Sequence, residues 1–140
     1  MDTQQLAITA LREGNFTCAV ACRGQVVFTS KARGVKPLVD FYREHGEAYR
    51  GGALADKVVG RAAVLLARLG GIASVYGEVM SMSAREELEK WGMTAGYGTL
   101  TEGIRNRNNT GPCPMEALSA GVEDPREMLE KAEAFFESLA

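Results

Sequence analysis

The sequence is poor in the residues that build metal sites and disulfides. It contains one histidine and three cysteines among 140 residues. A structural zinc site takes about four nitrogen or sulfur ligands, which this composition can hardly supply. The odd cysteine count, with an acidic N-terminus unlike a secretory signal, indicates free thiols in a reducing compartment. We therefore expect a cytoplasmic protein in which Cys18 and Cys22 serve as small buried hydrophobic residues.

Long apolar runs and an excess of positive charge are also absent. No apolar run reaches the roughly 18 residues expected of a membrane span. The formal net charge is −2, with acids and bases interspersed, so no basic field favours nucleic acid. Neither a membrane nor a nucleic acid is therefore an expected partner. What is present is 46% hydrophobic residues, enough for one globular domain spanning residues 1–140.

Hydrophobic periodicity and the positions of glycine and proline divide the chain into helices and strands. Arg23 and Gly24 suit the two-residue turn of a β-hairpin. Asp56 suits the N-cap of the most regular helix, and Ser83 suits the N-cap of the next one. The pattern predicts helices over 1–14, 35–49, 56–69, 83–91, from 114 onward and 124–140, and strands over 16–22, 25–30, 71–81 and 95–104.

This order predicts an α/β fold with three layers, α/β/α, around a mixed sheet. The hairpin is antiparallel, whereas the strand–helix–strand unit from Ile72 to Thr101 should be parallel and right-handed. Three segments should then meet at one edge of the sheet, residues 55–57, 80–83 and 101–116. Ligands commonly bind beyond the carboxyl ends of parallel strands, so this edge is the expected site.

Three short motifs resemble those of a bacterial family of uncharacterised proteins assigned to the cytidine deaminase-like fold. They are "GVKPL" at 34–38, "ADKVVGRAA" at 55–63 and "IRNRNNTGPCPME" at 104–116. The resemblance covers most of the chain, from the hairpin to Glu116. It implies the deaminase-like fold and a site at the shared edge, and oligomers are frequent in such folds. It does not imply a reaction.

The residues that hold zinc in deaminases are missing. Those enzymes need His or Cys, and Glu two residues later, at the first active-site helix, and two cysteines at the second. At the first position this chain has Asp56 and Lys57, and residues 80–85 contain no cysteine. Cys113 comes after the next strand, one unit too late, and brings only one thiolate. We therefore expect neither a bound metal nor a cofactor.

Several side chains at the expected edge are candidates for binding or chemistry. Asp56, Lys57 and Cys113 are the catalytic candidates. A helix cap and a surface lysine explain the first two equally simply, and a structural role is favoured for Cys113, because no histidine is placed to activate its thiol. Fork-shaped cations and amides after the last strand suit a phosphate, a carboxylate or a nucleobase edge, although asparagines also close turns. The ligand-binding candidates are Lys57, Ser81, Arg105, Asn106, Arg107, Asn108 and Glu116.

Three functions remain open on the sequence. The first is metal-independent binding of a small polar ligand, a nucleotide or related metabolite, at the shared edge. The second is a hydrolase or transferase that uses Asp56, Lys57 and Cys113. The third is an interaction module without catalysis, in which the sheet edge or the helix bearing Phe135 and Phe136 forms a homodimer.

Overall fold

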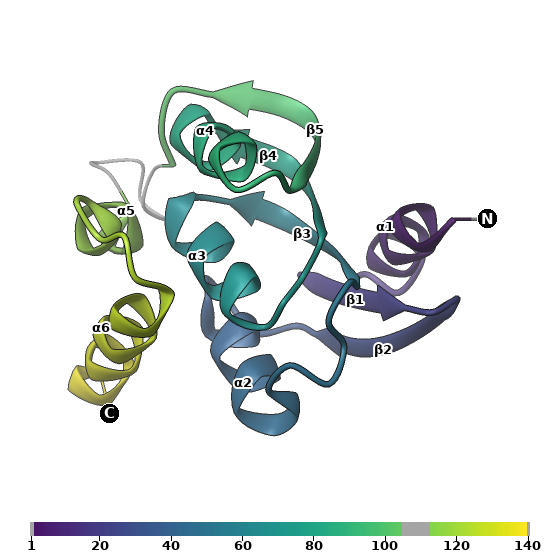
Figure 1. The fold of residues 1–140 in the computed structure, drawn as a ribbon, viewed down its shortest axis with the longest axis horizontal. Helices are drawn as coiled ribbons and strands as arrows, with labels where there is room; N and C mark the ends of the chain where they lie inside the picture. The colour runs from purple at the N-terminus through teal and green to yellow at the C-terminus, as the bar shows by residue number, and fades with distance from the viewer. Residues whose placement is uncertain (1, 105–112, 140) are drawn as a thin grey trace.

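The computed structural model describes residues 2–104 and 113–139. The chain alternates helices and strands through most of its length and ends in two helices (Figure 1). In chain order the elements are α1 Thr3–Glu13, β1 Cys18–Cys22, β2 Gln25–Ser30, α2 Lys36–His45, β3 Ala53–Val59, α3 Arg61–Leu69, β4 Ser74–Ser81, α4 Met82–Lys90, β5 Thr94–Thr101, α5 Pro114–Ser119 and α6 Pro125–Ser138.

The five strands form one mixed sheet in the order β2-β1-β3-β4-β5. β1 runs antiparallel to both β2 and β3, whereas β3, β4 and β5 are parallel. The predicted hairpin turn is confirmed: Arg23 and Gly24 both have positive φ, which the tight turn between twisted strands requires. The predicted parallel unit is also confirmed, since β4 and β5 flank α4.

Helices cover both faces of this sheet, which confirms the predicted three-layer α/β/α class (Figure 1). On one face, α1 buries Ala7 and Leu11 against small side chains of β1 and β3. On the other face, α2, α3, α4 and α6 enclose the larger core, which includes Leu38, Leu65 and Met128. The described part of the chain contains no helix long and apolar enough to cross a membrane.

The predicted helix from Asp56 to residue 69 is wrong at its N-terminal end. Residues 53–59 form the central strand β3, and α3 begins only after Gly60. β3 pairs with β1 on one side and with β4 on the other. The backbone hydrogen bonds of these two pairings outweigh the helical pattern predicted for Val58 and Val59. Asp56 is therefore a strand residue and not a helix cap.

One smaller boundary also differs from the prediction. β4 continues to Ser81 and leads directly into α4, so Ser81 is the N-cap and not Ser83. The Ser81 Oγ accepts a hydrogen bond from the Ala84 N–H at 3.1 Å. The last helix begins as predicted, with Asp124 accepting from the Arg126 N–H at 2.9 Å and Pro125 in the first turn.

The sheet topology determines where a ligand could bind. Because β3, β4 and β5 are parallel and in register, Val59, Met80 and Leu100 lie side by side near their carboxyl ends. The first turn of α3 follows directly on this edge, and α5 and α6 stand beside it (Figure 1). The parallel pairing thus brings the ends of these strands together at one edge, as predicted. The segment that β3 contributes to this edge begins after residue 59, however, and not at 55–57.

Candidate functional site

A pocket of about 540 Å³ lies between the end of β3, the start of α3 and the two C-terminal helices. Its size falls within the range of small-molecule sites. Side chains of the sheet and α3, with the segment before α2, form one wall. Cys113, Met115, Phe135 and Phe136 form the other wall. The lining is therefore largely apolar, with few polar groups.

Asp56 is the buried polar residue of this pocket. Its carboxyl group is only 5% exposed, because Asp56 sits in the middle of the sheet between Cys18 and Gly77. The Val58 N–H donates to its Oδ1 at 3.1 Å, and the Cys18 thiol donates to the same carboxyl. Burial nevertheless dominates and raises the pKa of Asp56 to about 8. Burial likewise raises the pKa of the Cys18 thiol well above its usual value, with the Asp56 charge adding to it.

The charged residues of the pocket lie nearer to solvent than Asp56. Arg33 and Lys57 line it and are exposed, while Glu116 is half-buried. The Lys57 N–H donates to the Thr17 carbonyl at 3.1 Å, so the backbone of this residue is held in place. Of the predicted site, Asp56, Lys57, Cys113 and Glu116 are therefore brought together around one pocket.

Glu116 occupies the space next to Gly60, the N-cap of α3. A Cβ atom at Gly60 would lie 2.5 Å from the Glu116 Oε1, so a larger residue there would require the flexible Glu116 side chain to move. Gly60 provides no side-chain cap of its own. The free N–H groups of a helix N-terminus favour a nearby negative charge, so the α3 N-terminus is a favourable place for the Glu116 carboxylate.

Ser81, another predicted ligand residue, is separate from this pocket. Its side chain is fully buried and its hydroxyl caps α4, 3.2 Å from the Ser83 hydroxyl. The predicted donors Arg105, Asn106, Arg107 and Asn108 lie outside the described residues. The lone histidine, His45 at the end of α2, packs among the rings of Phe28, Phe41 and Tyr49 and does not line the pocket.

Comparison with known proteins identifies the family and the fold. The family model described as "TM1506: Domain of unknown function (DUF1893)" matches residues 6–136. The chain belongs to the DUF1893 family. A crystal structure of a DUF1893 family protein (TM1506) from Thermotoga maritima aligns with a TM-score of 0.84 and 21% identity, covering 94% of this chain and 88% of that one. That likeness shows the fold alone. No significant match was found among curated proteins.

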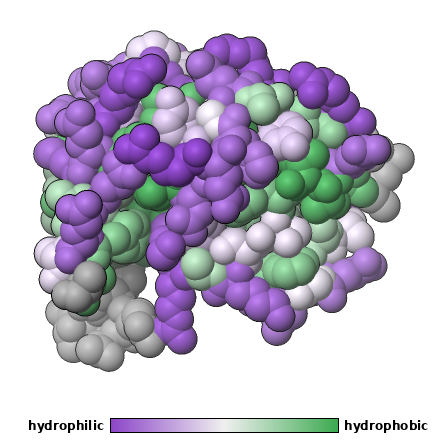
Figure 2. Space-filling view, turned by 90° about the horizontal axis from the view of Figure 1, so that it is seen from below, coloured by the Kyte–Doolittle hydropathy of each residue, from purple (hydrophilic) through white to green (hydrophobic). Residues whose placement is uncertain are grey.

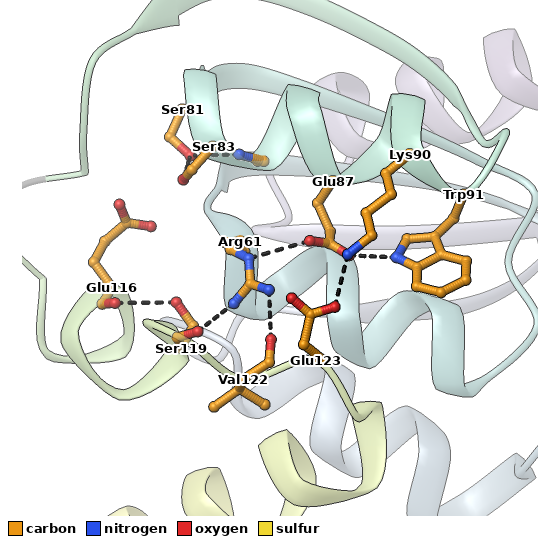
Figure 3. Close-up of polar contacts among 11 residues, drawn as sticks. Arg61, Ser81, Ser83, Glu87, Lys90, Trp91, Glu116, Ser119, Val122 and Glu123 are labelled. Atoms are coloured by element: carbon orange, nitrogen blue, oxygen red, sulfur yellow. Dashed lines mark hydrogen bonds and ion pairs between the residues drawn. The ribbon is translucent and has the colours of Figure 1, made fainter.

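A second polar cluster in this DUF1893 chain was missed by sequence reasoning. Arg61, in the first turn of α3, pairs its Nε with the Glu87 Oε1 at 3.2 Å (Figure 3). Its two terminal nitrogens donate to the carbonyls of Ser119 and Val122, and the Trp91 indole N–H donates to Glu87. Arg61 thereby ties the segment between α5 and α6 to α3 and α4. It positions the outer wall of the pocket.

Only tertiary structure could reveal the Arg61 cluster. From the spacing, Arg61 appears on the polar side of an extended helix, and Glu87 appears as one of several acids in "REELEK". Once α3 starts at Arg61, the arginine faces the adjacent helix α4 and the C-terminal segment.

The described residues, 2–104 and 113–139, contain no group of three or more histidine, cysteine or acidic side chains able to hold a metal ion. All three cysteines are free, and Cys113 is half-buried at the start of α5. The Cys113 N–H donates to the Ile104 carbonyl at 2.8 Å. The chemistry visible around the pocket is therefore that of a buried carboxyl, exposed cations and a partly accessible thiol.

Proposed function

We propose that this protein binds a small organic molecule in the Asp56 pocket without a metal ion. The observation that carries the proposal is a buried carboxyl lining a pocket of about 540 Å³ whose other walls are largely apolar. A concave apolar site with a few convergent polar groups and a perturbed pKa is typical of ligand sites. The ligand then needs an apolar body as well as a polar group, a less polar molecule than the sequence alone predicts.

The related expectations from the sequence belong to the same proposal. A kinship with the cytidine deaminase-like fold is supported by the N-terminal helix, the hairpin and the alternation of helices with parallel strands. A cytoplasmic location is supported by the three free cysteines. Donation by Arg105, Asn106, Arg107 and Asn108 to a polar end of the ligand stays a prediction. A bound nucleotide or related metabolite also stays a prediction.

Protein-observed NMR tests the binding proposal directly. Small molecules with an aromatic or aliphatic body and one polar group are added singly at millimolar concentration to the labelled protein. We expect shifts of the Ala62, Ala63 and Met115 amides. Val58→Trp should abolish them, because Val58 lines the pocket and is 45% exposed, so a larger side chain can fill the space without entering the core.

Val26→Trp is the matched control for that experiment. Val26 lies on β2, is 42% exposed and does not line the pocket. Binding that Val58→Trp removes and Val26→Trp preserves supports the proposed site. Shifts that survive Val58→Trp place binding elsewhere and contradict the proposed site.

The proposal also states that binding needs no metal ion. Elemental analysis of dialysed protein should therefore show well below one equivalent of zinc.

A second candidate function is general acid–base catalysis in the same pocket. Asp56 favours it, because burial raises the pKa of this carboxyl to about 8, close to neutral pH. Cys113 lines the same pocket and would be the nucleophile of a hydrolase or transferase, with Lys57 nearby. Rapid alkylation of Cys113 at neutral pH, slowed by Asp56→Asn, would favour the enzyme. Slow alkylation unaffected by that variant would favour binding alone.

The homodimer alternative finds less support. Phe135 and Phe136 are half-buried, touch each other edge to face and line the pocket from α6. The face seen in Figure 2 is mainly hydrophilic, with its apolar residues in separate patches. The exposed large hydrophobic residues are likewise scattered over different elements: Val26, Val58, Met82, Trp91, Tyr97 and Leu139. A homodimer stays a prediction, which sedimentation of the purified chain would test.

A further inference from the structure

The chemistry of the ligand can be inferred from the surroundings of Asp56, on the basis of the proposed pocket. Among the described residues, the groups that contact the Asp56 carboxyl are the backbone N–H groups of Val58 and Lys57 and the Cys18 thiol. All three are neutral donors, and no ion pair among those residues includes Asp56. Burying a charged group without a partner of opposite sign is strongly unfavourable. The carboxyl therefore lacks a cation within the described chain.

The cations that line the pocket in the described part of the chain do not fill this role. Arg33 and Lys57 line it, but both are exposed, whereas Asp56 is nearly inaccessible. Their charges stay in contact with water, where interactions with a buried group are screened. The rest of the lining is largely apolar and includes Val35, Ala63 and Phe136. The pocket thus combines a buried carboxyl and apolar side chains with exposed cations and the half-buried Glu116.

We propose that the ligand is an amphipathic amine or amidine, whose basic nitrogen pairs with the buried Asp56 carboxyl while its apolar body lies against the α3 and α6 side chains. The pairing supplies a cation that the described residues do not provide to Asp56. A carboxylate or phosphate ligand fits this arrangement less well. The exposed Arg33 and Lys57 would bind its negative charge, and the Asp56 carboxyl would stay unpaired. The negative charge of the buried Asp56 carboxylate is thus the reason for proposing a cationic ligand.

Binding of an amine should release a proton. In the empty pocket Asp56 has a pKa of about 8 and is mostly protonated at pH 7. When an ammonium ion binds, the carboxylic acid passes its proton to solvent and the resulting carboxylate pairs with the ligand. Affinity should therefore rise by up to about tenfold per pH unit below pH 8 and level off above it. The other ionisable or charged groups around the pocket and Asp56 are Cys18, Arg33, Lys57, Cys113 and Glu116.

Three phenyl compounds of matched size test the proposal: 2-phenylethylamine, neutral 2-phenylethanol and anionic 3-phenylpropanoate. Calorimetric titrations at pH 6 and 7.5, in two buffers with different ionisation enthalpies, report affinity and proton release. We expect the amine to bind more tightly at pH 7.5 and to release close to one proton per molecule at pH 6. Asp56→Asn should weaken amine binding at least tenfold and abolish the proton release. The alcohol should bind wild type and Asp56→Asn alike.

Asp40→Asn is the control carboxyl variant. Asp40 lies on α2, pairs with Lys36 at 3.1 Å at the surface and does not line the pocket, so amine binding should not change. NMR spectra confirm that each variant is folded. Amine binding that Asp56→Asn leaves intact overturns the inference. Selective binding of 3-phenylpropanoate that is lost in Arg33→Ala or Lys57→Ala also overturns the amine inference. That result would still support ligand binding in the proposed pocket. Absence of pocket shifts with all three compounds contradicts both proposals.

Discussion

Asp56 and Glu87 are both buried acids, yet their surroundings differ. Each is 5% exposed. Glu87 receives hydrogen bonds from the Arg61 guanidinium and the Trp91 indole, so its charge is balanced inside the protein. Asp56 has only neutral donors among the described residues, and burial raises its pKa to about 8. A paired buried acid holds elements together, whereas an unpaired one lining a pocket is a candidate binding group.

The largest expected effect is at the paired acid. Arg61→Ala should lower the free energy of unfolding by about 3–5 kcal/mol, because it leaves Glu87 buried without its cation. Urea unfolding at pH 7 measures the change. Arg43→Ala, which breaks the more exposed ion pair to Glu133 at 2.6 Å, should lower it much less, because water screens that pair. Equal losses in the two variants would show that Glu87 does not depend on Arg61.

Asp56→Asn should have the opposite sign and depend on pH. The folded-state pKa of Asp56 is about 8, above its ordinary value of 3.8. Wild type therefore loses stability as pH rises from about 4 to 8, whereas the variant, which mimics the neutral acid, does not. The free energy of unfolding of Asp56→Asn, relative to wild type, should therefore increase by up to about 1.4 kcal/mol per pH unit across this window. Urea unfolding at pH 5 and 7 measures it; a constant difference would mean that Asp56 is not protonated in the fold.

Trp91→Phe tests the second partner of Glu87. Removing the indole N–H should lower the free energy of unfolding by about 1–2 kcal/mol, since hydrogen bonds to charged groups contribute about that much. The Arg68 guanidinium, 3.4 Å from the Trp91 ring centroid, retains an aromatic partner in this variant. An unchanged urea midpoint would indicate that Arg61 alone balances Glu87.

The smallest effect is expected at the thiol beside Asp56. Cys18→Ala removes a donor that lowers the pKa of the Asp56 carboxyl, so that pKa should rise by a fraction of a unit. Carbon-13 NMR of the carboxyl group across pH follows the titration. Cys22→Ala is the control, because Cys22 lies at the far end of β1 near the carbonyls of Tyr49 and Arg50. A lowered pKa in Cys18→Ala would contradict the assigned contact.

Local signals predicted much of the fold correctly. The Arg23–Gly24 turn, the helix start at Asp124 and Pro125, and the strand predicted within 71–81 each depend on neighbouring residues, and the structure confirms all three. β3 was missed because its residues suit a helix by spacing and a strand only by pairing with β1 and β4. Such pairing involves residues far apart in sequence, which periodicity cannot detect.

The site was predicted less completely than the fold. Asp56, Lys57, Cys113 and Glu116 do line one pocket, but Asp56 was expected to cap a helix and Ser81 to face a ligand. The apolar contribution of Phe135 and Phe136 to that pocket was not foreseen, because α6 reaches it only through packing on α3.

The sequence by itself determined the class of fold, the parallel β4–α4–β5 unit and the scarcity of metal ligands, because each depends on composition or on residues close together in the chain. The tertiary structure alone decided which acid is paired. Arg61 and Glu87 are 26 residues apart and meet only because α3 packs beside α4. Asp56 is buried without such a partner because the central strand carries it into the sheet, where no described cation follows.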